Sequence, residues 1–356
     1  MKKVQKIAIL IPAFNEALVI SRTLESLLRL VPANDIFVVD DGSSDATKMI
    51  SLKYTNNVAK TPNHGKAHAL NFGIKYFKLP KNYDYIFFMD ADSQPRADFL
   101  KKVMPHFNND NKKKLICVVG QVKGRGVNWI SKYRQWEYHI SHFIHKRAQE
   151  ILKSMLVVPG CATVYRSKIF AKLEFPSGTL TEDMDFTFLL HRTGNNKMLF
   201  EDKAIVYTQD PQNLKDFIKQ LKRWYTGFWQ VVRKYDIPWQ GQVLDLEVTM
   251  LALEGLYNGL IVIFFLFSFI PLLIFKELNI FTLPFLIDLF IFFIPSLIWS
   301  SIVDKDIKRV FYLPLFYFLR FISSLIFLRS FFYGFLSSEK EYVWDSKRYT
   351  QERQVI

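Results

Sequence analysis

Two aspartates separated by one residue, Asp90 and Asp92, directly follow an apolar run at residues 85–89. Carboxylate oxygens are the ligands that hard cations such as magnesium and manganese prefer. Two carboxylates on one turn can therefore share a metal ion and hold the charged part of a nucleotide. The same triplet, with Ala91 between the acids, also occurs in solvated turns and helix caps. Its position after an apparently buried strand favours the metal site.

A second pair of acids, Asp40 and Asp41, ends another apolar run and precedes Gly42. A carboxylate at a strand end can accept a hydrogen bond from the imide N–H of uracil, which would select the base of a nucleotide. Further along, Gly65 permits close approach of the backbone, and Lys66 at a helix start can face phosphates. Both segments are equally compatible with an ordinary turn or a loop-to-helix junction.

The triplet Thr181, Glu182 and Asp183 is our candidate catalytic element. Displacement at an anomeric carbon by an acceptor hydroxyl needs one base to remove the hydroxyl proton, and one carboxylate suffices. We assign this role to Asp183, although the triplet also suits the first turn of a helix. In a later basic segment, Arg223 can clamp a diphosphate and Trp224 offers a flat face to a sugar ring. That segment is also typical of a helix on a membrane surface.

Three histidines, His139, His142 and His145, recur at intervals of three residues in a long aromatic segment. Such spacing is compatible with a metal site, but no cysteine or carboxylate cluster accompanies the histidines. We therefore favour a location at the membrane surface over metal binding.

The elements that must position these residues alternate between strand and helix. Continuous apolar runs predict buried strands at residues 7–11, 36–39, 58–60, 85–89 and 118–122. Helical periodicity between them, at residues 16–30 and 65–78, predicts a parallel sheet with right-handed crossovers. Ligands bind at the carboxyl ends of strands in such sheets. The acidic clusters described above fall at two of those ends.

The chain changes character near residue 238, where a Pro-Trp-Gln-Gly segment breaks the pattern. We expect a cytosolic domain at residues 1–237, with amphipathic helices near 131–153 and 213–234, and a linker at 238–249. A transmembrane region of two to four helices follows at residues 250–336, and a tail at 337–356.

Three apolar stretches in that region, residues 251–275, 280–303 and 310–336, are long enough to cross a bilayer. Arg320 and Arg329 interrupt the third stretch, and charges at bilayer depth are costly. An interfacial or re-entrant segment is the alternative there. The charged loop between the second and third stretches should be cytoplasmic.

The composition agrees with a membrane protein. Half of the residues are hydrophobic, and the formal net charge is +14. Nucleic-acid binding, an anionic membrane surface and a nucleotide site each suit this charge, and the membrane surface suits it best. Two cysteines, Cys117 and Cys161, are too few for a disulfide framework and suit a reducing compartment. We expect no signal peptide, and hence a cytoplasmic catalytic domain on a multi-pass protein of the cell membrane.

In this order, the segments resemble the processive family 2 glycosyltransferases of the GT-A fold. That group contains the cellulose, chitin, hyaluronan and poly-N-acetylglucosamine synthases. The resemblance covers about residues 6–230 and rests on the segments 12–16, 40–43, 65–71, 90–92, 160–166, 181–183, 202–204 and 220–224.

The resemblance implies an α/β fold, the GT-A nucleotide-sugar-binding fold, followed by a C-terminal helical membrane region. It implies inverting transfer of a sugar from a UDP-sugar, UDP-GlcNAc or UDP-glucose above others, to a membrane-associated polysaccharide or a lipid-linked acceptor. Mg²⁺ or Mn²⁺ would be the cofactor, the lipid bilayer and an accessory export subunit would be partners, and nucleic acid would not. The alternatives are a single-addition lipid glycosyltransferase and, more remotely, a non-catalytic nucleotide-binding scaffold or transporter.

The resemblance also distributes roles among the residues. Asp183 would be the catalytic base, and Asp92 with Asp90 would hold the metal. Donor-binding residues would be Pro12, Ala13, Phe14, Glu16, Asp41, Lys66, Asp90, Ala91 and Asp92. Residues for the diphosphate and the acceptor would be Gly160, Glu182, Gln220, Arg223 and Trp224.

Overall fold

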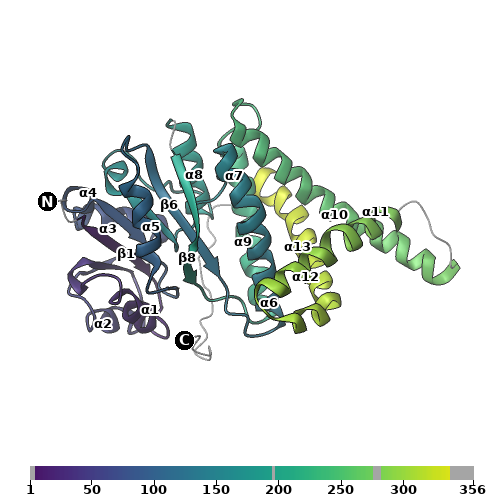
Figure 1. The fold of residues 1–356 in the computed structure, drawn as a ribbon, viewed down its shortest axis with the longest axis horizontal. Helices are drawn as coiled ribbons and strands as arrows, with labels where there is room; N and C mark the ends of the chain where they lie inside the picture. Colours follow the sequence, from purple (N-terminus) through teal and green to yellow (C-terminus); the bar gives the residue numbers. More distant parts are fainter. Residues whose placement is uncertain (1–4, 195–196, 276–281, 337–356) are drawn as a thin grey trace. The chain divides into compact units, whose positions relative to one another are not determined.

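The structure is a computed structural model that describes residues 5–194, 197–275 and 282–336 (Figure 1). The predicted tail at 337–356 lies outside the described residues. The chain divides into two units. The first unit takes residues up to 125 and residues 145–209, and the second takes residues 126–144 and those from 210 onwards. The chain therefore passes from one unit to the other at three points within the described sequence.

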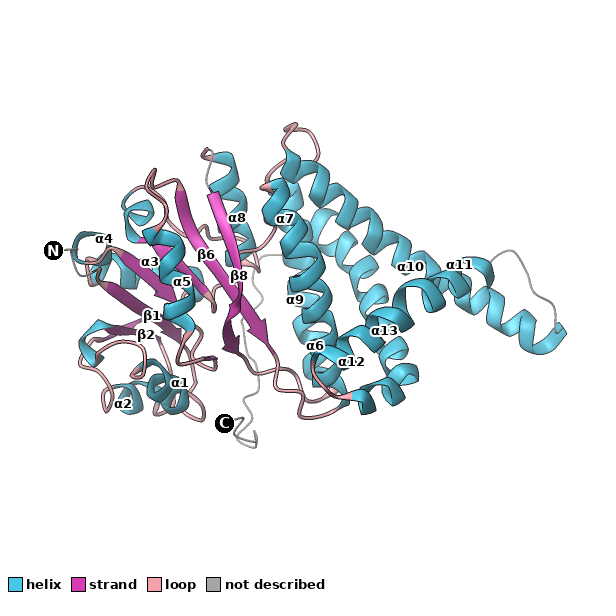
Figure 2. Cartoon of the chain, viewed as in Figure 1, coloured by secondary structure: helices cyan, strands magenta, loops and turns pink. Residues whose placement is uncertain are grey.

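An eight-stranded sheet runs through the first unit in the order β3-β2-β1-β4-β7-β6-β8-β5 (Figure 2). Its strands are β1 (Ile7–Ala13), β2 (Ile36–Asp41), β3 (Val58–Thr61), β4 (Tyr85–Phe88), β5 (Gln94–Pro95), β6 (Leu115–Lys123), β7 (Thr163–Arg166) and β8 (Lys197–Tyr207). The first four strands of this order pair in parallel, as the sequence predicts. Strand β7 is antiparallel to both of its neighbours, so the sheet is mixed.

The helices of the first unit are α1 (Ile20–Leu27), α2 (Thr47–Ser51), α3 (Lys66–Tyr76), α4 (Leu79–Asn82), α5 (Phe99–Asn108), α7 (Arg147–Leu152) and α8 (Glu182–Arg192). Helix α3 packs closely on β1 and β2, because Gly73 has no side chain at the contact. A Cβ on Gly73 would lie 2.7 Å from Val39 Cγ2 and 2.8 Å from Leu10 Cδ1. This close contact fixes the start of α3, where Lys66 lies, beside the ends of the parallel strands.

The second unit is helical. It contains α6 (Trp129–His139), α9 (Leu214–Lys234), α10 (Val243–Phe275), α11 (Thr282–Ile287), α12 (Ile294–Val303) and α13 (Leu313–Phe331), with a 3-10 turn at Ile307–Tyr312 and π-helical turns at Asp288–Phe293 and Phe332–Leu336. The predicted helix at 131–153 is one continuous helical stretch whose middle, Ile140–Lys146, is π-helical. Helix α6 begins at a capping box, in which Asn128 and Ser131 each bind the other's backbone N–H.

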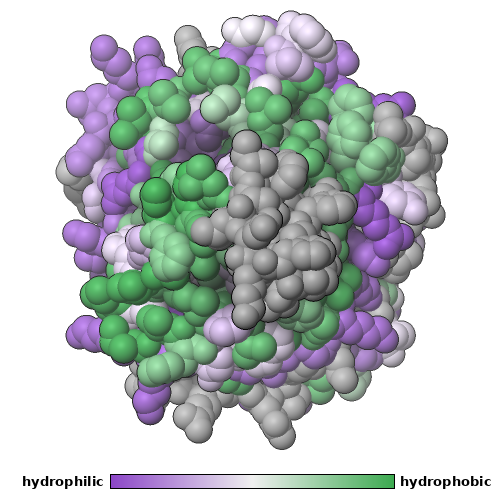
Figure 3. All heavy atoms as spheres, turned by 90° about the vertical axis from the view of Figure 1, so that its right-hand side faces the viewer, coloured by the Kyte–Doolittle hydropathy of each residue, from purple (hydrophilic) through white to green (hydrophobic). Residues whose placement is uncertain are grey.

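Two stretches of the second unit have the length and apolar composition of membrane spans, Leu283–Val303 and Ile307–Phe335. Several of their large side chains are exposed, among them Phe290 and Phe311. Figure 3 shows hydrophobic side chains over much of the face that it presents. The first predicted span, 251–275, lies in α10, but the side chains of residues 261–275 lie outside the described part of the structure.

Arg320, which interrupts the third predicted span, is accommodated within a continuous α13. Its guanidinium binds both carboxylate oxygens of Asp288 at 2.5 and 2.8 Å, and its second nitrogen also binds Asn258 Oδ1 at 2.8 Å. A paired guanidinium is far less costly in an apolar bundle than a single charge. The segment around Arg320 is therefore a continuous helix, within a stretch long and apolar enough to cross a bilayer.

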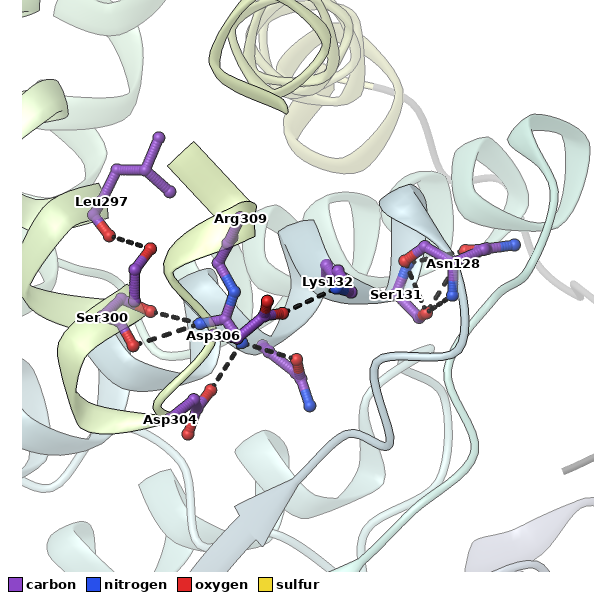
Figure 4. A network of polar contacts seen from close by, with 10 residues as sticks. Asn128, Ser131, Lys132, Leu297, Ser300, Asp304, Asp306 and Arg309 are labelled. Atoms are coloured by element: carbon purple, nitrogen blue, oxygen red, sulfur yellow. Dashed lines mark hydrogen bonds and ion pairs between the residues drawn. The ribbon is translucent and has the colours of Figure 1, made fainter. Parts of the chain in front are cut away.

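A second buried arginine, Arg309, lies where the chain turns between α12 and α13 (Figure 4). Only 1 % of its surface is exposed. It donates to the carbonyl and Oγ of Ser300, to Asp304 Oδ2 and, on α6, to Gln135 Oε1. On the same turn, Asp306 accepts from Lys132 Nζ at 2.6 Å. These contacts fasten α6 to the turn.

Candidate active site

The Asp90–Asp92 turn leaves β4 and is held on three sides. The backbone N–H of Ser93 donates to the carbonyl of Asp90 at 3.2 Å, which closes the turn. Ala91 is buried, and its carbonyl accepts from Thr23 Oγ1 at 2.8 Å. Ser93 Oγ donates to Asp92 Oδ1 at 3.0 Å. Both carboxylates therefore lie on a rigid turn and remain partly exposed. A metal ion that binds from solution can reach them.

The ends of β1 and β2 lie side by side, because Ala13 pairs with Asp40 in the parallel register. Pro12 and Phe14 flank Ala13 and are half-buried. The segment after β1 then turns at Asn15, which has a φ of 55°. Further on, the buried Glu16 donates its backbone N–H to Thr47 Oγ1 at 2.8 Å. The structure thus brings the segment 12–16, predicted to bind the donor, next to Asp40 and Asp41.

Asp41 has a structural task that the sequence did not indicate. Its carboxylate accepts hydrogen bonds from the backbone N–H groups of His64, at 3.2 Å, and Gly65, at 2.9 Å. Burial raises its pKa, although both backbone bonds act in the opposite direction. The neighbouring Gly42 has a φ of 80°, and a Cβ there would lie 2.8 Å from the Asn63 nitrogen. Asp41 and Gly42 therefore shape the loop that delivers Lys66.

Lys66 joins two of the predicted site segments. Its ammonium lies 2.6 Å from Asp90 Oδ1 and 3.1 Å from Glu182 Oε1. Burial alone would lower its pKa, but Asp90, Glu182 and Asp183 together raise it above the usual value. A Cβ on Gly160 would lie 3.1 Å from the same ammonium, so Gly160 leaves room for it. Residues far apart in sequence therefore meet around one cation.

Asp183 lies in the first turn of α8, directly after Glu182. One of its oxygens, Oδ1, accepts from the backbone N–H of Met184 at 2.8 Å. This contact orients the carboxylate without neutralising it. The Asp183 charge contributes to the raised pKa of Lys66, which also contacts the neighbouring Glu182.

Cys161, next to Gly160 in the chain, is buried and was not predicted as a site residue. Burial raises the pKa of its thiol, the negative charges of Asp90, Asp92 and Asp183 raise it further, and only Lys66 opposes them. All three candidate carboxylates therefore act electrostatically on this one buried thiol. In the sequence, Cys161 was noted as one of two cysteines and lies within the segment 160–166, but it was given no role.

Lys146 is a second residue that the sequence did not single out. It is buried, and its ammonium donates to the carbonyl of Val157 at 3.1 Å. Burial lowers the pKa of Lys146 to about 8, against the opposing influence of Asp183, Cys161 and Cys117. Lys146 is thus a second buried amine of the first unit whose charge interacts with Asp183.

Lys146→Met should change how stability depends on pH. Between about pH 8 and the pKa of an unfolded lysine, about 10.4, the unfolded parent binds a proton that the folded parent does not. The parent therefore gains stability relative to the variant as pH rises through this window, by roughly 3 kcal/mol at most. Melting temperatures of both proteins in detergent at pH 7, 8, 9 and 10 measure this. The melting temperature of the variant minus that of the parent should fall as the pH rises above 8. A difference independent of pH would contradict the assignment.

The segment at 220–224 lies on α9 in the second unit, where α6 organises it. Arg134 is buried and donates to Gln220 Oε1 at 2.9 Å, and its guanidinium lies 4.3 Å from the centre of the Trp224 ring. The Glu137 carboxylate lies 2.5 Å from the Arg134 guanidinium and balances its charge. Arg134 therefore holds two of the three motif residues, and the roles of Gln220, Arg223 and Trp224 stay predictions.

The three histidines of the aromatic segment do not form a metal site among the described residues. His139 instead contacts Ser300 Oγ at 2.8 Å and Asp304 Oδ1 at 3.2 Å within the second unit.

Comparison of the sequence with protein-family models identifies the family of the first unit's domain. Residues 8–174, which contain the Asp41 loop, the Asp90–Asp92 turn and Gly160, match the model of Glycosyl transferase family 2. Residues 8–174 form a family 2 glycosyltransferase domain.

Curated relatives of this domain are similar over more of the chain. The poly-β-1,6-N-acetyl-D-glucosamine synthase of Staphylococcus aureus is 29 % identical over 238 residues, which are 65 % of this chain and 56 % of the relative. The enzyme of that name from Staphylococcus epidermidis is 27 % identical over 248 residues, 65 % of this chain and 58 % of the relative. The chain thus spans little more than half the length of these relatives.

Among solved structures, a mannosyltransferase from Pyrobaculum calidifontis in complex with GDP-mannose and Mn²⁺ aligns with a TM-score of 0.61. The alignment covers 93 % of this chain and 88 % of the other, at 14 % identity. At such identity the likeness shows the fold alone. It confirms the predicted GT-A fold followed by C-terminal helices.

Proposed function

We propose that this chain transfers a sugar from a UDP-sugar to a membrane-associated glycan or a lipid-linked acceptor, with inversion at the anomeric carbon. Asp183 acts as the general base. It removes the proton of the acceptor hydroxyl while that oxygen bonds to the anomeric carbon and the bond to the nucleotide diphosphate breaks. One carboxylate is enough for such a single displacement.

The observation that carries the proposal is the position of the Lys66 ammonium, which contacts Asp90 on the metal turn and Glu182, the residue directly before Asp183. A base for the acceptor and anionic groups for the donor must lie within one sugar of each other for direct transfer. Both segments belong to the first unit.

Other observations support the proposed donor and acceptor. Asp41 retains lone pairs beyond the two that Gly65 and His64 use, so its carboxylate can still accept the imide N–H of uracil. The curated relatives are named for N-acetylglucosamine polymers, which favours UDP-GlcNAc, with UDP-glucose second. The two candidate spans support a membrane protein of several spans, with its catalytic domain in the cytoplasm. An accessory membrane or export subunit is a further expectation.

A divalent cation, Mg²⁺ or Mn²⁺, fits the residues of the Asp90–Asp92 turn. Asp90 already accepts a cation, the ammonium of Lys66, at 2.6 Å and is partly exposed. Two carboxylates complete such a site when substrate phosphates and water supply the other oxygens. When bound, the cation would neutralise the charge that develops on the departing diphosphate. Asp92 and Asp90 would hold it.

Removal of divalent metal is expected to abolish sugar transfer. Purified protein in nanodiscs, assayed with radiolabelled UDP-GlcNAc and UDP-glucose, should lose at least about 99 % of its turnover in EDTA, because uncompensated leaving-group charge costs several kcal/mol. Excess Mn²⁺ or Mg²⁺ should restore it. An unchanged melting temperature in EDTA serves as the control for folding. Full turnover in chelator would disprove the metal assignment.

The length of the product separates a synthase from an enzyme that adds a single sugar. A ladder of products on a sizing gel is expected for repeated addition. One fixed increment would replace the polymerase proposal by single addition to a lipid. Absence of transfer from every UDP-sugar would favour a nucleotide-binding scaffold.

A further inference from the structure

The Lys66 ammonium lies where two segments with different tasks meet. It contacts Asp90 Oδ1 at 2.6 Å on the metal turn and Glu182 Oε1 at 3.1 Å beside the candidate base. The side chain is 30 % exposed, against 13 % for Glu182. Lys66 is thus a cationic bridge that solvent reaches from the side of Asp90.

The backbone of Lys66 is fixed, so its ammonium can travel only as far as its flexible stem allows. Asp41 holds the preceding Gly65, which has a φ of 88°, and Gly73 fastens α3 to the sheet. The ammonium packs near Gly160, where a Cβ would lie 3.1 Å away. Side-chain rotation can therefore release Asp90 while the backbone stays in place.

We propose that the Lys66 ammonium and the divalent cation compete for the Asp90 carboxylate. In the site without donor, Lys66 neutralises Asp90 and ties it to Glu182. A metal ion on Asp90 repels the ammonium, which then moves to the diphosphate that arrives with the metal. The ammonium and the metal ion are both positive and repel each other in a partly buried site. They therefore cannot both stay bound to the same carboxylate oxygen.

The consequence is an order of events. Release of Lys66 from Asp90 also loosens its hold on Glu182, next to Asp183. The base segment is then freed for an acceptor only after metal and donor are bound. This inference rests on the proposed function for the role of Asp90, but its test needs no turnover.

The test measures Mn²⁺ binding by the full-length protein in detergent, using the electron paramagnetic resonance signal of free Mn²⁺. Without nucleotide, Lys66→Met should bind Mn²⁺ about tenfold more tightly than the parent, because the competing cation is gone. With saturating UDP the order should reverse, and the variant should bind Mn²⁺ about tenfold more weakly, because the diphosphate has lost a counter-ion.

The chain offers a matched control on the same helix. Lys75 pairs with Glu174 at 2.7 Å and is largely exposed. Lys75→Met removes the same charge from α3 and should leave Mn²⁺ binding within twofold of the parent. Lys66→Arg keeps the charge and should stay close to the parent, which shows that the effect of Lys66→Met comes from the lost charge. In an Asp90→Asn background, Lys66→Met should have no effect without nucleotide.

Equal or weaker Mn²⁺ binding by Lys66→Met without nucleotide would overturn the inference. A full effect of Lys66→Met in the Asp90→Asn background would overturn it as well, because Lys66 would then act elsewhere. If the parent transfers sugar and Lys66→Met still shows no tighter binding, the proposed function stands and the competition alone is disproved.

Discussion

Asp183→Asn is expected to lower kcat for sugar transfer by roughly 100- to 10,000-fold. Asparagine has the shape of aspartate, and its Oδ1 can still accept the N–H of Met184 that Asp183 accepts at 2.8 Å. What it lacks is a group that can take the acceptor proton. The loss should therefore fall on kcat, with little change in donor affinity or melting temperature. Initial rates with saturating UDP-sugar, and UDP binding by calorimetry, measure both quantities.

Asp185, two residues further along α8, is the matched control. It is fully buried and accepts from Thr179 Oγ1 at 2.8 Å, so its carboxylate supports the segment before α8. Asp185→Asn should lower the melting temperature and reduce kcat far less than Asp183→Asn does. If Asp183→Asn turned over donor at the parental rate, another group would have to be the base.

Arg309→Met is expected to destabilise the second unit by about 3–5 kcal/mol, because it removes one partner from a buried charged network. Arg309 is 1 % exposed and binds Ser300, Asp304 and Gln135. The variant leaves the Asp304 carboxylate and the Gln135 amide with one bond fewer in a site from which water is largely excluded. Unfolding in detergent, followed by tryptophan fluorescence, should show the loss.

Lys132 provides the comparison within the same turn. Its ion pair with Asp306 has a similar length, 2.6 Å, but both side chains are more than a fifth exposed. Lys132→Met should therefore cost less than about 1 kcal/mol. Equal effects of the two variants would mean that burial of the Arg309 network does not set its strength.

Much of the sheet could be predicted, because β1, β2 and β4 are continuous apolar runs that end in polar residues. The antiparallel direction of β7 could not, since a four-residue strand carries no mark of its direction. Strand β8 was missed for a different reason. Its apolar residues are interrupted by three charged residues at 201–203, and the pairing register with β6 shifts there, from Gly120 opposite Glu201 to Gln121 opposite Ile205. An irregular strand hides its period of two.

The site shows the same division between local and long-range information. Asp90, Asp92 and Asp183 were predicted from short segments whose chemistry is visible in the residues themselves. The contact of Lys66 with Glu182 and the burial of Lys146 depend on how distant segments pack, for which no local pattern exists. Arg134 likewise looked like one of many basic residues, and only its position beside Gln220 and Trp224 distinguishes it.

The alternation of the chain between its two units has a consequence for biosynthesis. All strands of the first unit have been synthesised once the ribosome has passed Tyr207. Helix α6 is synthesised early, whereas α12 and α13, which contact it, are synthesised last. The side chains of Tyr133 and Trp136 pack against Phe316 and Phe293 of those late segments. On the ribosome, α6 therefore waits with an aromatic face uncovered. Its capping box favours helix formation before those late segments are made.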